Sequence, residues 1–221
     1  MIKLFSPSIS SNEIEIATKV LRSLNWASGS GGGKVDELEK KLKKYFGADE
    51  CVAVDNGTAA LHLSLDSIDV KSKEVLVPSL TFVSTVHSIV HNGGKPVFVD
   101  VDPKTMCIDI IDLKKKITKK SKVIIPVHFG GLPCNMIDIK KIAKQKKLHI
   151  VEDAAHAFGA KVSGNMIGSS SEMVCFSFNP VKNLSKENKN MKIEIISFQD
   201  LIDQANKEKE IERKKTNKRW T

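Results

Sequence analysis

Hydrophobic and polar positions follow two patterns along the chain, a helical spacing near the N-terminus and short apolar runs further on. In residues 10–24 and 35–47, apolar side chains recur three and four positions apart, and the second stretch stops at Gly47. This spacing predicts two helices, the second ending at a glycine that can take up the left-handed conformation. Residues 25–34, rich in glycine and serine, predict a flexible turn between the two helices.

From residue 50 onward, short apolar runs alternate with helical stretches. The runs predict strands at residues 50–54, 74–77, 96–101, 122–127 and 148–153. The stretches between them predict helices at residues 59–68, 81–94, 108–118 and 136–147. Short apolar runs separated by helices are typical of strand–helix–strand units, in which consecutive strands run parallel. The pattern therefore predicts an α/β fold around a mainly parallel sheet.

Length and composition narrow the class of protein. With 221 residues, of which 41% are hydrophobic, the chain is long enough to bury a core. No stretch approaches the roughly 18 to 20 uninterrupted apolar residues of a membrane span, and the N-terminus lacks the apolar segment of a signal peptide. We expect a soluble, cytoplasmic protein that does not bind membranes.

The four cysteines predict neither a disulfide framework nor a metal site. They are scattered without a closely spaced pair, and each lies in or beside an apolar run, at Cys51, Cys107, Cys134 and Cys175. Small buried thiols explain this placement better than zinc ligands do. No metal is therefore expected.

The net charge of +9 is compatible with binding either nucleic acid or a phosphorylated ligand. Much of the excess lies in lysine runs on the polar sides of predicted helices, which indicates solvated helix faces. The chain has a single tyrosine, and few of its aromatic residues are expected to be exposed for stacking on bases. Nucleic-acid binding therefore stays the minor alternative.

Three segments place polar or reactive side chains where predicted strands end, the edge at which open parallel sheets bind ligands. The segment "VDNGTAAL" puts Gly57, Thr58 and Ala59 at the start of a helix, where free N–H groups and a hydroxyl can hold an anion. An ordinary turn and helix cap would have the same sequence. On its own this segment does not decide between the two interpretations.

The other two segments carry a carboxylate and an amine. "LHIVEDAAH" contains Asp153 and His156, and "CFSFNPVKNLS" contains Ser177 and Lys182. Taken singly, Asp153 has the simpler interpretation of a helix cap, and Lys182 is one lysine in a lysine-rich chain. The evidence for chemistry is the combination of these residues in one sheet.

In the order of its motifs, the chain resembles the DegT/DnrJ/EryC1/StrS family over about residues 3–185. The matching segments are "PSIS", "NGTAALHL", "VPSLTFVSTVHSIVHNGGKPVFVDVDP", "VHFGGLPCNM", "VEDAAHAFGA" and "CFSFNPVKN". The family consists of fold-type-I aminotransferases that depend on pyridoxal 5'-phosphate (PLP) and act on nucleotide-linked keto sugars. The resemblance implies the large domain of an aspartate-aminotransferase-like fold, with three layers, α/β/α.

The resemblance also implies a role for each candidate residue. Lys182 would bond covalently to the cofactor's aldehyde and move protons, and Asp153 would keep its pyridine nitrogen protonated. Phe82 would lie against the ring, and His156 near the ring and its phenolic oxygen. The phosphate would be held by Gly57, Thr58, Ala59 and Ser177.

The function implied is amino transfer from glutamate to a nucleotide-activated keto sugar in the synthesis of polysaccharides or related glycans, by a homodimer. One alternative is the keto-sugar dehydratase branch of the family, whose members have histidine at the lysine position. The other is a noncatalytic relic or binding protein that keeps the family signature. Lys182 favours amino transfer over dehydration.

The likeness ends shortly after Lys182. Residues 186–221 are strongly charged, where the family continues into a glycine-rich loop and a C-terminal small domain. We therefore expect a PLP-binding large domain with its N-terminal helical segment at residues 1–185, and an atypical charged segment at 186–221. The small domain is expected to be absent from this chain, and a separate polypeptide is one way to supply it.

Overall fold

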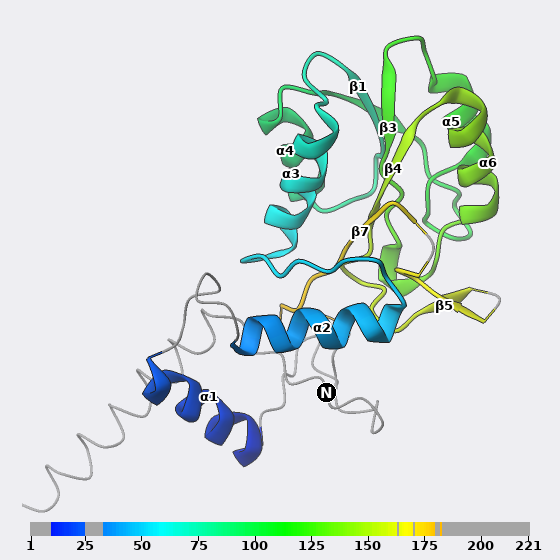
Figure 1. Ribbon diagram of the computed structural model, residues 1–221. Coiled ribbons are helices and arrows are strands. Elements are labelled where there is room, and N and C mark those ends of the chain that lie inside the picture. Colours follow the sequence, from blue (N-terminus) through cyan, green and yellow to red (C-terminus); the bar gives the residue numbers. More distant parts are fainter. Residues whose placement is uncertain (1–9, 25–32, 163, 170, 180–181, 183–221) are drawn as a thin grey trace, which may run out of the picture.

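The protein was analysed as a computed structural model that describes residues 10–24, 33–162, 164–169, 171–179 and 182. Its centre is a five-stranded sheet in the order β2-β1-β3-β4-β7 (Figure 1), and all its paired strands run parallel. The strands are β1 (Glu74–Pro78), β2 (Lys95–Val99), β3 (Ser121–Ile124), β4 (His149–Asp153) and β7 (Met173–Cys175). The predicted parallel sheet is confirmed. The predicted segment 186–221 lies outside the described residues.

Helices cover both faces of the sheet (Figure 1). The helices α3 (Gly57–Ile68) and α4 (Val83–His91) pack on one face, and α5 (Ile110–Lys116) and α6 (Met136–Lys146) pack on the other. Successive side chains of β1 alternate between the two layers, with Val75 and Val77 in the first cluster and Leu76 in the second. The predicted three-layer α/β/α fold is confirmed.

The two predicted N-terminal helices are α1 (Ser11–Ser23) and α2 (Lys34–Phe46). Gly47 ends α2 with a φ of 65°, as its sequence position predicts. From α2, Phe46 stacks on Phe176 with ring centroids 4.7 Å apart. This contact holds α2 against the segment that follows β7.

The predicted strand at residues 50–54 is wrong, because residues 51–54 form no regular secondary structure. The Ala53 N–H donates to Glu39 Oε1 at 2.8 Å, a side chain of α2. Val52 is exposed, and Cys51 packs in the aromatic cluster that α2 forms with Phe158. Packing against a helix therefore replaces the ladder hydrogen bonds that the apolar run predicted.

A short antiparallel pair, β5 (Lys161–Val162) and β6 (Asn165–Met166), follows β4 and was not predicted. Of the four thiols, three are buried as predicted, while the thiol of Cys51 is half-buried; none forms a disulfide. Within the described part of the chain, no helix combines the length and the apolar character needed to cross a membrane.

Candidate functional site

The strand order reverses direction between β1 and β3. The strand that follows β1 in sequence, β2, lies on one side of it, and the strand that follows β3, β4, lies on the opposite side. The loops after two such strands diverge to opposite sides, and open α/β sheets bind ligands at this point, beyond the carboxyl ends of the strands. Phe82 follows β1, the turn η2 (Phe129–Gly131) follows β3, and Asp153 ends β4.

The start of α3 offers backbone donors to an anion. Asn56 caps the helix by accepting the Ala59 N–H at 2.8 Å with its side chain and the Ala60 N–H at 3.1 Å with its carbonyl. Among the described residues, the N–H groups of Gly57 and Thr58 have no such partner. They point from the positive end of the helix dipole, where negative charge is stabilised. The cap differs from the prediction for Ala59, whose N–H is already engaged.

Ser177 lies beside this helix start. A Cβ added to Gly57 would lie 3.1 Å from the Ser177 Cβ and 3.3 Å from the carbonyl oxygen of Phe176. Since few real side chains approach so closely, a Cβ at residue 57 would require the segment after β7 to shift by a few tenths of an ångström. The close approach brings Ser177 beside the Gly57 end of α3, although the two segments are far apart in the sequence.

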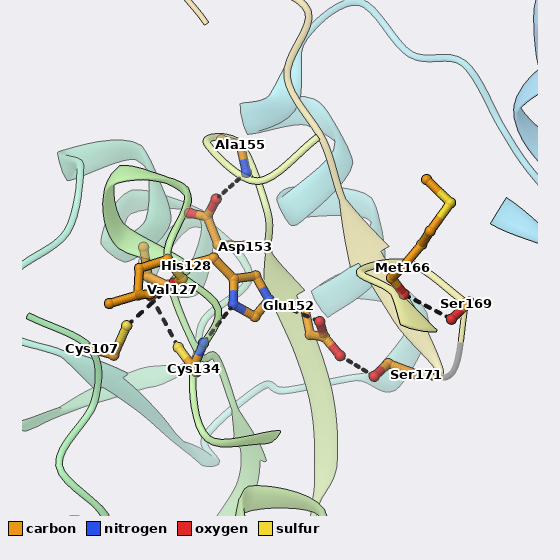
Figure 2. A network of polar contacts seen from close by, with 11 residues as sticks. Cys107, Val127, His128, Cys134, Glu152, Asp153, Ala155, Met166, Ser169 and Ser171 are labelled. Atoms are coloured by element: carbon orange, nitrogen blue, oxygen red, sulfur yellow. Dashed lines mark hydrogen bonds and ion pairs between the residues drawn. The ribbon is translucent and has the colours of Figure 1, made fainter. Parts of the chain in front are cut away.

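Asp153 is buried at the end of β4, with 6% of its surface exposed. Its Oδ2 accepts the Thr85 hydroxyl at 2.8 Å. Its Oδ1 accepts the Ala155 N–H at 3.2 Å (Figure 2). The Thr85 hydroxyl in turn accepts from Thr81 at 2.8 Å. Donors to both oxygens fix the direction in which the carboxyl group points.

The amine of Lys182 lies between an imidazole and an aromatic ring. Its Nζ is 2.9 Å from His156 Nε2 and 6.0 Å from the centroid of the Phe82 ring. Phe82 is 69% exposed, so its face is open to a flat ligand. Three residues predicted from separate segments are therefore close together.

His156 also connects this amine electrostatically to Asp153. Burial and the positive charge of Lys182 lower the pKa of His156, and the carboxylate of Asp153 opposes that shift. On its other side, the His156 ring packs edge to face against Phe129, with centroids 6.2 Å apart. The net effect is a His156 pKa below its ordinary value, which favours the neutral imidazole.

Behind the site, a polar network built around the buried His128 and Glu152 connects β4 to the turn after β3 (Figure 2). His128 Nε2 lies 2.9 Å from Glu152 Oε2, and the Cys134 N–H donates to His128 Nδ1 at 3.0 Å. The Ser171 hydroxyl donates to the other oxygen of Glu152. Because Glu152 precedes Asp153, the network holds the strand end that carries the site carboxylate.

Sequence reasoning missed three residues that shape the site, namely Asn56, Thr85 and His128. Thr85 left a signal in the sequence, because it is a polar residue on the buried side of α4, as is Ser88. Asn56 follows the usual preference for helix caps and could have been predicted as one. His128 precedes a glycine turn, and nothing in its local sequence indicates that Glu152 lies opposite.

The arrangement fits PLP by its donor set. An amine, a buried carboxylate, an exposed aromatic face and a helix start with two available amides correspond to an aldehyde, a pyridine nitrogen, a flat ring and a phosphate. The Lys182 amine lies 6.0 Å from the centroid of the exposed Phe82 ring, on which such a ring could stack. The described residues contain no group of three or more His, Cys, Asp or Glu side chains suited to a metal ion.

Comparison with known proteins decides the family. Residues 7–187 match the model of the DegT/DnrJ/EryC1/StrS aminotransferase family. The chain belongs to this family. The match covers more than half of the sequence and includes every residue of the candidate site. Aminotransferases of this family use PLP as their cofactor, as the resemblance implied.

Two curated relatives and one solved structure illustrate the similarity. The chain is 41% identical to the spore coat polysaccharide biosynthesis protein SpsC of Bacillus subtilis, over 81% of this chain and 46% of that protein. It is 37% identical to the GDP-perosamine synthase of Escherichia coli O157:H7, over 80% of this chain and 48% of that protein. The chain thus spans about half the length of these relatives.

The solved structure is a putative sugar aminotransferase, Spr1654 from Streptococcus pneumoniae, in its PLP form. It superimposes with a TM-score of 0.75 at 33% identity, over 82% of this chain and 50% of that one. The same protein in its PMP form, with pyridoxamine phosphate, gives a TM-score of 0.76. The fold of this family member is therefore that of PLP-dependent aminotransferases.

Proposed function

We propose that the chain binds PLP through Lys182 and Asp153 and transfers an amino group from glutamate to a nucleotide-linked keto sugar. The observation that supports this most directly is the amine of Lys182 beside His156 and the Phe82 ring, with the buried carboxylate of Asp153 acting on the same imidazole. The relatives add the substrate class, since one is named for a GDP-linked amino sugar.

When bound, PLP supplies an aldehyde that bonds to amines and a ring that accepts electrons. Lys182 would bond to the aldehyde. Once the amino donor has displaced it, the Lys182 amine would take the proton from the donor's α carbon and pass it to the cofactor. Asp153 would accept a hydrogen bond from the protonated pyridine nitrogen. Its two donors, from Thr85 and Ala155, would hold its oxygens in place for this role.

The remaining site residues would bind and orient. Gly57 and Thr58 would donate their N–H groups to the phosphate, and the Ser177 hydroxyl would add a third donor. Phe82 would cover one face of the ring. Since Ala59 already donates to Asn56, its part would be to keep the helix start in place.

We further propose a role in polysaccharide or related glycan synthesis, as a cytoplasmic homodimer. The likeness to SpsC, which is named as a spore coat polysaccharide biosynthesis protein, supports the first part. The dimer and the location rest on likeness to the family. Because the chain spans about half of its relatives, a second polypeptide that completes the substrate site is compatible with the same proposal.

The test is an amino-transfer assay with the purified chain, PLP, glutamate and a panel of GDP- and UDP-linked keto sugars. We expect 2-oxoglutarate and a sugar in which an amino group replaces the keto oxygen, both detected by mass spectrometry. A deoxy sugar without nitrogen would assign the chain to the dehydratase branch. Binding of PLP without any reaction of glutamate would contradict the proposal and favour a noncatalytic binding protein.

A further inference from the structure

Several serine and threonine hydroxyls in the helices of this protein donate backward along their own helix. In α1, the Thr18 hydroxyl donates to the carbonyl four residues back at 2.8 Å. In α4, the Ser88 hydroxyl donates to the Thr85 carbonyl at 2.8 Å. The hydroxyls of Ser23 and Ser67 each donate to the carbonyl three residues back. A hydroxyl inside a helix commonly finds its acceptor there.

The hydroxyl of Thr85 departs from this pattern. It donates across the layers to Asp153 Oδ2 at 2.8 Å, although Thr85 lies within α4 and is fully buried. A hydroxyl has a single proton, so this proton is not available to a carbonyl of the helix. The surroundings of Thr85 must therefore favour the outward direction.

Thr81, four positions before Thr85, provides this preference. Its Oγ1 donates to Thr85 Oγ1 at 2.8 Å. Because the Thr85 proton goes to Asp153, the contact between the two threonines requires the proton of Thr81. The donated bond occupies a lone pair of the Thr85 oxygen and polarises its hydroxyl, which strengthens the bond that Thr85 donates onward.

The same short segment also carries the aromatic ring of the candidate site. Phe82 follows Thr81 directly, and 69% of its surface is exposed. The Phe82 carbonyl accepts the Thr85 N–H at 3.0 Å. Thr85 is thus bonded to the backbone of the residue with the exposed ring, to the Thr81 hydroxyl and to the site carboxylate. The position of the ring and the direction of the carboxylate depend on one set of contacts.

We propose that Thr81 is a positioning residue of the candidate site, whose hydroxyl directs the Thr85 proton toward Asp153 and so fixes where that carboxyl group points. Thr81 acts through Thr85 and has no need to touch the ligand. The consequence for the cofactor rests on the proposed function, in which Asp153 accepts a hydrogen bond from the pyridine nitrogen of PLP. A carboxyl group without this direction would accept that bond less well, because hydrogen bonds weaken steeply away from their preferred geometry.

The first test is titration with PLP of Thr81→Val, which keeps the shape of the side chain and removes its hydroxyl. The Thr85 hydroxyl is then free to donate to a carbonyl one turn back. We expect the PLP dissociation constant to rise about two- to tenfold, the worth of one ordinary hydrogen bond. Thr81→Ser, which keeps the hydroxyl, is the matched control and should bind PLP like the wild type. Equal dissociation constants for the valine and serine variants would overturn the proposal.

The second test asks whether Thr81 acts through Thr85. In a chain that already carries Thr85→Val there is no Thr85 proton to direct, so adding Thr81→Val should leave the PLP dissociation constant unchanged. A further rise by the full factor of the single Thr81→Val variant would overturn the proposal. If Thr85→Val does not fold, the comparison of the two Thr81 variants decides alone.

The third test needs no cofactor and separates this inference from the proposed function. Urea unfolding of the wild type, both single valine variants and the double variant should show a combined loss of unfolding free energy smaller than the sum of the single losses. Strict additivity would overturn the role of Thr81. If PLP binds and the losses add, only this inference fails. If the losses are coupled and the wild-type chain binds no PLP, the proposed function fails, while the contact between the two threonines stands.

Discussion

Thr85 donates its hydroxyl to the buried carboxylate of Asp153, with Oγ1 and Oδ2 2.8 Å apart. The hydroxyl lies on α4 and the carboxylate ends β4, so the bond ties a helix of one layer to the central sheet. Neither atom is exposed enough for water to replace its partner readily, since Thr85 is fully buried and Asp153 nearly so. The direction of the site carboxylate therefore depends on packing between the layers.

Replacing Thr85 by valine should destabilise the fold. The variant keeps the shape and leaves a buried carboxylate with one donor fewer, which costs about 1.5 to 3 kcal/mol for a bond to a charged group. Urea unfolding measures the loss. Thr85→Ser, which keeps the hydroxyl, is the matched control, and equal stability of the valine and serine variants would contradict the role given to this bond.

Gly57→Ala should weaken PLP binding. The added Cβ would lie 3.1 Å from Ser177, so the helix start and the segment after β7 must move apart. Losing one donor to a charged phosphate corresponds to about tenfold or more in the dissociation constant. Titration with PLP checks this, with Leu63→Ala, an exposed position of the same helix, as the control that should bind normally.

The pKa of His156 predicts how stability depends on pH. Because burial and Lys182 lower the pKa of His156 below the ordinary value of 6.5, the unfolded chain protonates this residue first as pH falls. The contribution is fully present above pH 6.5 and is lost as pH falls through the lowered folded value. Urea unfolding from pH 8 to pH 5 should show a smaller decline in His156→Gln than in the wild type. Parallel curves for the two proteins would refute the shift.

The pair of His128 and Glu152 should be strongly coupled. Removing either partner leaves the other buried with an unmet polar group, and such losses cost about 3 to 5 kcal/mol. We expect His128→Leu and Glu152→Leu each to lower the unfolding free energy by this order. The double variant should lose clearly less unfolding free energy than the sum of the two single losses. Strict additivity would show that the residues do not interact.

The sequence predicts the layers of this fold well because the layers follow from periodicity. The apolar runs at 74–77 and 148–153 became β1 and β4, and the amphipathic stretch at 136–147 became α6. The run at 50–54 failed because its Ala53 N–H donates to Glu39 of α2, a helix that was itself predicted but whose contact with this run the local pattern does not reveal. Periodicity reports which side of an element is buried, not which element covers it.

The sequence indicates candidate site residues but not the contacts between them. Lys182, Asp153 and Phe82 came from ordered motifs, and the parallel sheet brings such loops to one edge. Two hydrogen bonds were not predictable, the one from the Thr85 hydroxyl to Asp153 and the one from the Gly130 N–H to His156. Each joins residues that meet only after the layers have packed. The hydrogen bond from the Ala59 N–H to the Asn56 side chain likewise depends on the geometry of the helix cap. The segment "DNGT" does not determine that geometry.

The most direct test of the central claim is the absorption spectrum of the purified chain with PLP. We expect a visible band of lysine-linked cofactor that disappears when glutamate is added and never forms in Lys182→Ala. Lys144→Ala, which alters an exposed lysine of α6, is the matched control and should give the wild-type band. A band of equal strength in Lys182→Ala, or no band in the folded wild-type chain, would contradict the assignment of Lys182 as the residue that holds the cofactor.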